Sequence, residues 1–147
     1  MKQILVGLDG SPRAPAVLAA AASVARATGA KLTLVRSVGI PPDVPVDFWK
    51  ATDEPLLELL QRHARESLEA LAATAPKDVL GGCEVIVGVP WQTVCDRARE
   101  VGADLVVVGS HGYGGLDRLL GTTAAKIVNH ASCSVLVVRE AQGETKP

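Results

Sequence analysis

The apolar positions of the chain fall into two alternating patterns. Short runs with an apolar centre predict five buried strands, at 4–8, 31–38, 83–87, 105–108 and 135–138. Between them, apolar residues recur every three or four positions, which predicts helices at 12–29, 55–75, 90–102 and from 122 onward. A chain that alternates strand and helix in this way is typical of an α/β fold.

Residues at the expected helix ends support these boundaries. Ser11 can cap a helix whose first position is Pro12, and Gly29 suits its carboxyl end. Pro76 should stop the second helix. For that helix we expect one buried face, made of Leu56, Leu59, Leu60, His63, Ala64, Leu68 and Leu71. The segment 39–53, with three prolines and few apolar residues, is expected to be a loop.

The strand centres are apolar almost throughout, which indicates strands covered on both faces. We therefore predict a single doubly wound five-stranded parallel sheet with helices on both faces, a Rossmann-like α/β fold. In such sheets a ligand binds beyond the carboxyl ends of the strands, where the strand order reverses. Candidate site residues should therefore follow strands.

Composition excludes several classes of protein. The 147 residues are 48% apolar and 21% charged, which suits one globular domain, and we take 141–147 as a polar tail. A formal charge of -1 argues against a nucleic-acid partner, although backbone N–H groups can still bind polyphosphate. No apolar run approaches the length of a membrane span, and no signal peptide is visible.

The three cysteines are far apart and form no Cys-x-x-Cys motif. We expect reduced thiols in a cytoplasmic protein, and no protein-built metal site.

The candidate chemistry lies in the stretch 105–138. A buried strand leads into Gly109-Ser110-His111-Gly112, and Gly121-Thr122-Thr123 opens the next helix. Glycine allows a ligand to approach the backbone closely, and a helix start offers unpaired N–H groups and a positive dipole end. Any one of these glycines suits an ordinary turn, but together they predict a phosphate site.

This combination resembles the nucleotide-binding signature of the universal stress protein family, and the likeness extends over 1–140. In the family's ATP-binding members the pattern is Gly, two residues, Gly, nine residues, Gly, then Ser or Thr. Here the longer spacer, 113–120, has eight residues. One residue fewer in a helical segment rotates the residues after it by about 100 degrees. Thr123 is therefore a candidate for the role that the family gives to the residue at Thr122.

The resemblance implies a strand order of 3-2-1-4-5, which places Asp9 and Gly109 on either side of one crevice. Leu8 and Asp9 would then contact the ribose or adenine side, and Ser37 or Val38 would line the adenine pocket. The phosphates would lie against the group Gly109, Ser110, His111, Gly112, Gly121, Thr122 and Thr123. The implied ligand is ATP, or ADP or AMP, with Mg²⁺ or Mn²⁺ carried by the phosphates. The family also pairs its fifth strand across a dimer, which implies a homodimer through Ser134 to Val138.

Three functions are open, in order of preference. The first is an adenine-nucleotide-binding stress-response protein with little or no hydrolysis, because no obvious base or arginine finger accompanies the motif. The alternatives are a nucleotide-free dimeric interaction protein of the same family and an enzyme of phosphoryl or adenylyl transfer. A hydrolase triad of Ser110, His111 and Asp117 is disfavoured, because the sequence around Ser110 is not Gly-x-Ser-x-Gly. No P-loop motif is present either.

Overall fold

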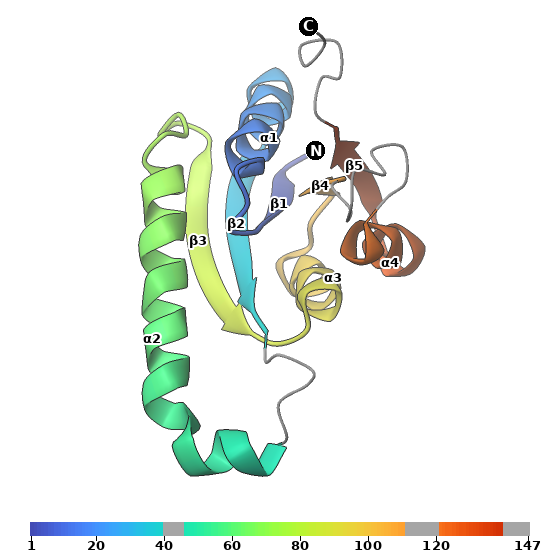
Figure 1. Ribbon diagram of the computed structural model, residues 1–147. Coiled ribbons are helices and arrows are strands. Elements are labelled where there is room, and N and C mark those ends of the chain that lie inside the picture. Colours follow the sequence, from blue (N-terminus) through green and yellow to red (C-terminus); the bar gives the residue numbers. More distant parts are fainter. Residues whose placement is uncertain (40–45, 111–120, 140–147) are drawn as a thin grey trace, which may run out of the picture.

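The computed structural model describes residues 1–39, 46–110 and 121–139, with the side chains of 46–55 left out. Its elements are, in chain order, β1 (Gln3–Leu8), α1 (Ala14–Thr28), β2 (Lys31–Val38), α2 (Val46–Ala72), β3 (Leu80–Val87), α3 (Pro90–Val101), β4 (Leu105–Gly109), α4 (Thr122–His130) and β5 (Ser134–Val138). All paired strands are parallel, in the order β3-β2-β1-β4-β5 (Figure 1). The predicted fold class and strand order are confirmed.

Helices cover both faces of the sheet (Figure 1). α1 and α2 pack on one face, against the side chains of Ile4, Val6 and Leu34. α3 and α4 pack on the other face, against Leu5, Val35 and Val106. Successive residues of β1 therefore point into different cores, as expected for a strand buried on both sides. Across the described ranges, no helix combines the length and the apolar character needed to cross a membrane.

β1 lies at the centre of the sheet. Val6 is paired with Leu34 of β2 on one side and with Val107 of β4 on the other, and all three side chains are fully buried. From β1 the chain passes to β2 on one side, and it later returns to β4 on the other side. The strand order thus reverses at the carboxyl ends of β1 and β4, where α/β sheets bind their ligands.

The first helix begins two residues later than predicted. α1 starts at Ala14, with Arg13 at the N-cap position, and the Ser11 hydroxyl accepts a hydrogen bond from the Arg13 N–H at 3.2 Å. Ser11 therefore bonds to the turn that precedes the helix. The predicted end is confirmed, since Gly29 follows the last helical residue with a φ of 79°.

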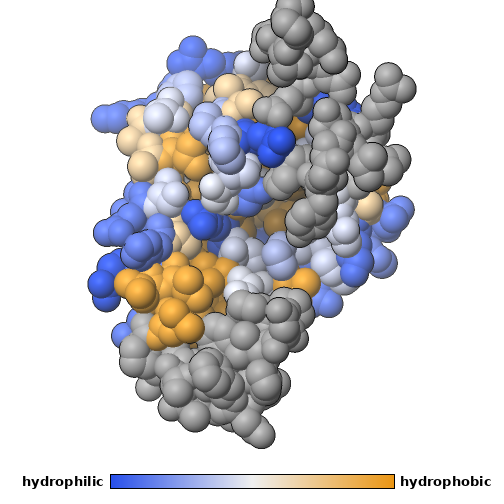
Figure 2. Space-filling model, in the orientation of Figure 1, coloured by the Kyte–Doolittle hydropathy of each residue, from blue (hydrophilic) through white to orange (hydrophobic). Residues whose placement is uncertain are grey.

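The second helix is longer than predicted, and its buried face differs. α2 begins at Val46, inside the expected loop. From Leu56 onward, its buried residues are Ala64, Leu68 and Ala72, whereas His63 is exposed and Leu56 and Leu59 are 40% and 43% exposed. The predicted face was therefore wrong in its first half, because an apolar pattern cannot show where a long helix extends past the sheet. In the view of Figure 2, a patch of apolar surface lies at the lower left of the molecule.

The third strand begins at Leu80, three residues earlier than predicted. Gly81 and Gly82 interrupt the apolar pattern there, and the register against β2 shifts between Leu32 and Thr33. The strand continues to Val87, so its carboxyl end, which matters for the site, lies where the sequence indicated.

Asp104, just before β4, fastens the starts of β1 and β4 together. Its Oδ2 accepts hydrogen bonds from the N–H groups of Lys2 at 2.7 Å and Gln3 at 2.9 Å. These backbone hydrogen bonds lower the pKa of the Asp104 carboxyl, because they favour its charged form. The side chain therefore contributes stability as a carboxylate.

The lowered pKa predicts a stability term that acid removes. A carboxyl whose pKa is depressed by folding stabilises the protein above its unfolded-state pKa, about 4, and loses this contribution as the pH falls through the folded-state pKa. We expect Asp104→Asn to lower the melting temperature near neutral pH and to flatten the acid side of the stability profile. Thermal melts over an acid pH series measure both. Glu58→Gln, the same charge change on an exposed residue of α2, is the control. An unaltered acid slope in Asp104→Asn contradicts this assignment.

The backbone conformation of Gly29 and Gly102 allows a second test of stability. Both follow helices with positive φ, 79° and 66°, and a Cβ at either would meet nothing within 4 Å. Alanine there should cost about 1 kcal/mol from backbone strain, or a melting temperature lower by a few degrees. Gly82 also has open space but no positive φ, so Gly82→Ala should be neutral or slightly stabilising. Equal losses in all three variants would show that conformation is not the cause.

Candidate functional site

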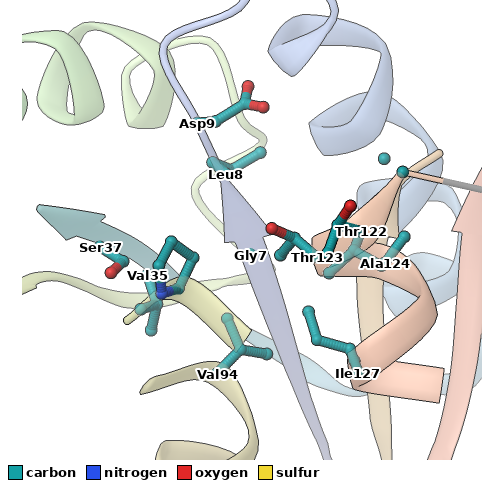
Figure 3. A pocket seen from close by; sticks show the side chains of 14 residues that line it. Gly7, Leu8, Asp9, Val35, Ser37, Val94, Thr122, Thr123, Ala124 and Ile127 are labelled. Carbon is teal, nitrogen blue, oxygen red and sulfur yellow. The ribbon is translucent and has the colours of Figure 1, made fainter. Parts of the chain in front are cut away.

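A pocket opens at the carboxyl ends of β1, β2 and β4, on the face covered by α3 and α4 (Figure 3). Its cavity has a volume of about 240 Å³. Gly7 lies at its floor, where a Cβ would come within 3.1 Å of Val108 Cγ1 and 3.2 Å of Val94 Cγ2. Since both valines also line the pocket, the small residue at position 7 lets β1, β4 and α3 meet closely beneath it.

One part of the pocket is apolar. Val35 of β2, Val94 of α3 and Ile127 of α4 line it, and all three side chains belong to the buried cluster on this face of the sheet. Pro90, at the start of α3, completes this wall. The pocket is therefore an opening of the core itself, with apolar side chains from three elements around a space suited to a flat apolar group.

The start of α4 forms a polar part. Thr122, Thr123 and Ala124 line the pocket, and Gly121 is the N-cap residue. No side chain among the described residues caps α4, and its first turn carries no acidic residue. Within the described part of the chain, the N–H groups of this turn and the positive end of the helix dipole therefore suit an anion.

Backbone hydrogen bonds join the two ends of the segment 111–120. The Gly121 N–H donates to the Ser110 carbonyl at 3.2 Å, and the Ser110 N–H donates to the Val138 carbonyl at 3.0 Å. These bonds fix the start of α4 against the end of β4 and against β5. The eight-residue spacer is thus compatible with Gly121, Thr122 and Thr123 lying at the pocket together.

Asp9 and Ser37 are the other polar side chains of the lining. The Asp9 carboxylate accepts a hydrogen bond from the Ser11 N–H at 3.0 Å. The Ser37 hydroxyl donates to the Gly88 carbonyl at 2.9 Å. In Figure 3, Ser37 and the threonines of α4 lie at opposite ends of the pocket, with Asp9 above the space between them. An elongated ligand would therefore meet different chemistry at its two ends.

α3 and α4 are joined beside the pocket by an aromatic contact. The rings of Trp91 and His130 lie 4.7 Å apart, and the Lys126 ammonium lies 5.5 Å from the Trp91 ring. Arg97 of α3 also donates to Glu84 of β3 at 2.7 Å. The ring contact thus joins α3 to α4, and the ion pair joins α3 to β3. Together they position the apolar wall and the threonines of the pocket. The half-buried Trp91 thus packs against the core of this face from its rim.

The structure brings most of the predicted site residues to this pocket. Seven of them line it, namely Leu8, Asp9, Ser37, Gly109, Gly121, Thr122 and Thr123. Val38 and Ser110 are buried and do not line it. Val38 is one residue out of phase, because side chains alternate along β2 and Ser37 already faces the pocket. His111 and Gly112 lie outside the described residues, as do Asp117 and the predicted tail.

Sequence reasoning missed the apolar wall. The same alternation that puts Ser37 in the pocket also puts Val35 there, so that residue was within reach of the sequence. Val94 and Ile127 carried no such signal, since each resembles any core residue of an amphipathic helix. Pro90 suits a structural turn before α3, and it also lines the pocket.

None of the three cysteines is among the residues that line the pocket. Cys95 is buried and Cys83 and Cys133 are half-buried, all three as free thiols. Burial raises the pKa of the Cys95 and Cys133 thiols, which disfavours the reactive thiolate. Within the described ranges, no three histidine, cysteine or acidic side chains gather as a metal site would require.

Comparison with known proteins gives a consistent relationship across the chain. A sequence model of the Universal stress protein family matches residues 1–139. Universal stress protein A homolog 1 of Coxiella burnetii is 35% identical over 138 residues, covering 93% of this chain and 95% of that protein.

Solved structures agree with this relationship. The universal stress protein UspA from Lactobacillus plantarum superposes with a TM-score of 0.78 at 28% identity, covering 94% of this chain and 97% of that one. A universal stress protein crystallised in complex with cAMP superposes with a TM-score of 0.62 at 26% identity, covering 95% and 98%.

Proposed function

The chain belongs to the universal stress protein family, and on that premise we propose that it binds an adenine nucleotide, ATP first, as a regulatory ligand. The family membership predicted from the sequence is thereby confirmed. A protein of the same family and fold was crystallised with cAMP, which supports an adenine nucleotide as the class of ligand. We place the nucleotide in the pocket at the ends of β1, β2 and β4.

The observation that carries this proposal is the division of the pocket into two kinds of surface. Val35, Pro90 and Val94 offer apolar contact for a base at the Ser37 end. The first turn of α4, with Thr122 and Thr123, offers N–H groups and hydroxyls for phosphates at the other end. Asp9, between them, is suited to accept hydrogen bonds from ribose hydroxyls.

A metal ion would enter with the phosphates. Asp9 is the one acidic residue among the described residues that line the pocket, and Mg²⁺ binds through one or two carboxylates together with substrate phosphates. We propose that Mg²⁺ or Mn²⁺ is carried by the phosphates of the nucleotide. The described lining holds no lysine, arginine or histidine, so we expect slow hydrolysis or none.

The alternative is a nucleotide-free interaction protein of the same family. If this alternative holds, side chains should fill the groove where phosphates would lie, and the protein should show no preference for adenine. The cavity of about 240 Å³ beside a helix start that no described side chain caps favours the nucleotide.

The two threonines provide the main test of this proposal. Replacing both by valine keeps the side-chain shape and removes two hydroxyls, while the N–H groups of α4 remain. A hydrogen bond to a charged group contributes roughly 1.5–3 kcal/mol, so we expect ATP affinity to fall about tenfold to a hundredfold for each hydroxyl that binds a phosphate. Isothermal titration calorimetry on nucleotide-stripped protein, with and without Mg²⁺, measures the change.

Thr74→Val is the matched control, because Thr74 follows α2 and does not line the pocket. Its ATP affinity should equal that of the unaltered protein. If the doubly substituted protein is folded and binds ATP with full affinity, the phosphates do not lie at α4. If the unaltered protein binds no adenine nucleotide at all, the proposed function is wrong.

We also propose that the protein forms a homodimer through β5. β5 is an edge of the sheet, paired with β4 along Ser134 to Val138. An exposed edge presents unpaired backbone groups that a second copy can pair with. Sedimentation equilibrium should give twice the chain mass of 15.3 kDa. A single species at the mass of one chain over the whole concentration range would refute the dimer.

A further inference from the structure

Ser37 lies at the apolar end of the pocket, and its hydroxyl proton is used in a hydrogen bond within the protein. The hydroxyl lies 2.9 Å from the Gly88 carbonyl oxygen. A carbonyl oxygen can only accept a hydrogen bond, so Ser37 must be the donor in this pair. Its oxygen then offers lone pairs, and no proton, to any ligand atom in the pocket.

The partner of Ser37 is fixed in place. The Gly88 N–H donates to the Val38 carbonyl at 3.0 Å, which ties the end of β3 to the end of β2. On its other side Gly88 lies against Thr93, since a Cβ at position 88 would be 2.8 Å from Thr93 Oγ1. Thr93 is itself buried. The Gly88 carbonyl is thus held by two strands and by α3, and Ser37 cannot turn its proton toward the pocket without leaving this bond unmade.

The surroundings of Ser37 strengthen the effect. Val35 and Val94 are both buried and line the same end of the pocket. In apolar surroundings, a polar ligand atom that faces Ser37 without a hydrogen bond has lost its water and gained no partner. The lining therefore distinguishes ligand atoms that donate from ligand atoms that accept.

We propose that Ser37 is a specificity-determining residue that selects 6-aminopurines over 6-oxopurines. This inference rests on the proposed function, because it requires the base to lie at the Ser37 end. Adenine carries an amino group, a donor, at the position where guanine and hypoxanthine carry a carbonyl oxygen, an acceptor. The adenine amino group can donate to Ser37 Oγ. A 6-oxo group would place its oxygen lone pairs against those of Ser37 Oγ, with no proton to form a hydrogen bond between them.

The experiment compares ATP with inosine triphosphate, in which a 6-oxo group replaces the amino group and N1 carries a proton; the change of their ratio in Ser37→Ala isolates the part that depends on Ser37. Calorimetric titrations of the unaltered protein should show ATP binding at least tenfold more tightly, since an unsatisfied buried acceptor is disfavoured by about this factor or more. Ser37→Ala removes the acceptor, so the ratio of the two dissociation constants should fall about tenfold. Ser37→Thr keeps a hydroxyl that can make the same bond to Gly88 and should restore the preference.

Thr123→Val is the control for the other end of the pocket. It should weaken ATP and inosine triphosphate by the same factor and leave their ratio unchanged, because both ligands carry the same phosphates. If ATP binds and the ratio is the same in Ser37→Ala as in the unaltered protein, the role of Ser37 is refuted while the proposed function stands. If neither nucleotide binds the unaltered protein, both are refuted.

An analogue series on the unaltered protein covers the case in which Ser37→Ala does not fold. N6-methyl-ATP keeps one amino proton, whereas N6,N6-dimethyl-ATP and purine riboside triphosphate keep none. We expect affinity in the order ATP, purine riboside triphosphate, inosine triphosphate, because losing a donor costs less than introducing a second acceptor. The inference would be overturned if inosine triphosphate bound as tightly as purine riboside triphosphate, or more tightly.

Discussion

The burial of β1 on every side is the constraint on which the rest of the structure depends. β1 is paired along both edges, and its side chains enter a different core on each face. A strand that lies between two strands and two helical layers must be apolar where it is buried, as β1 is from Ile4 to Val6, so the polar groups of this region follow where β1 ends. Asp9 follows directly, at the point where the strand order reverses and α1 leaves on the face opposite α3 and α4. The pocket is a consequence of this topology.

The same topology explains why the pocket has two unlike ends. β2 and the start of α3 bring apolar side chains from the core, with Ser37 as the polar group among them. α4 brings its amino end, whose first turn carries N–H groups, a dipole and two threonines but no acidic residue. Binding of a polyanion would then depend on oriented backbone dipoles more than on cations. Among the described residues that line the pocket there is no lysine, arginine or histidine, so the amino end of α4 is the positive feature of this lining.

Much of the fold could be predicted from the sequence because its signals are local. The apolar runs located all five strands, and Gly29 and Gly102 located two helix ends through a backbone conformation that other residues rarely adopt. The predictions failed where tertiary context decides. Leu56 and Leu59 continue the apolar pattern of α2 although 40% and 43% of their surface is exposed. The pair Gly81-Gly82 interrupts the apolar pattern at the start of β3, so the sequence predicts that strand too short.

The candidate site was predictable to the extent that it follows strand ends. Asp9 after β1, Gly109 at the end of β4 and the residues at the start of α4 could be predicted, because glycine, aspartate and threonine at such positions have a specific physical use. Val94 and Ile127 could not be found, since their place in the pocket depends on how α3 and α4 pack together. The sequence cannot distinguish Val38 from Ser37, because the direction in which each side chain of β2 faces is a property of the folded sheet.

The most direct test of nucleotide binding in this pocket is to map the ligand on the folded protein by its amide resonances. Isotope-labelled, nucleotide-stripped protein would be titrated with ATP and Mg²⁺, and the shifts of assigned backbone amides followed. We predict the largest shifts at Thr122, Thr123 and Ala124 for the phosphates and at Gly7, Asp9 and Ser37 for the nucleoside. Saturable shifts clustered on another surface, or none at all, would contradict this placement.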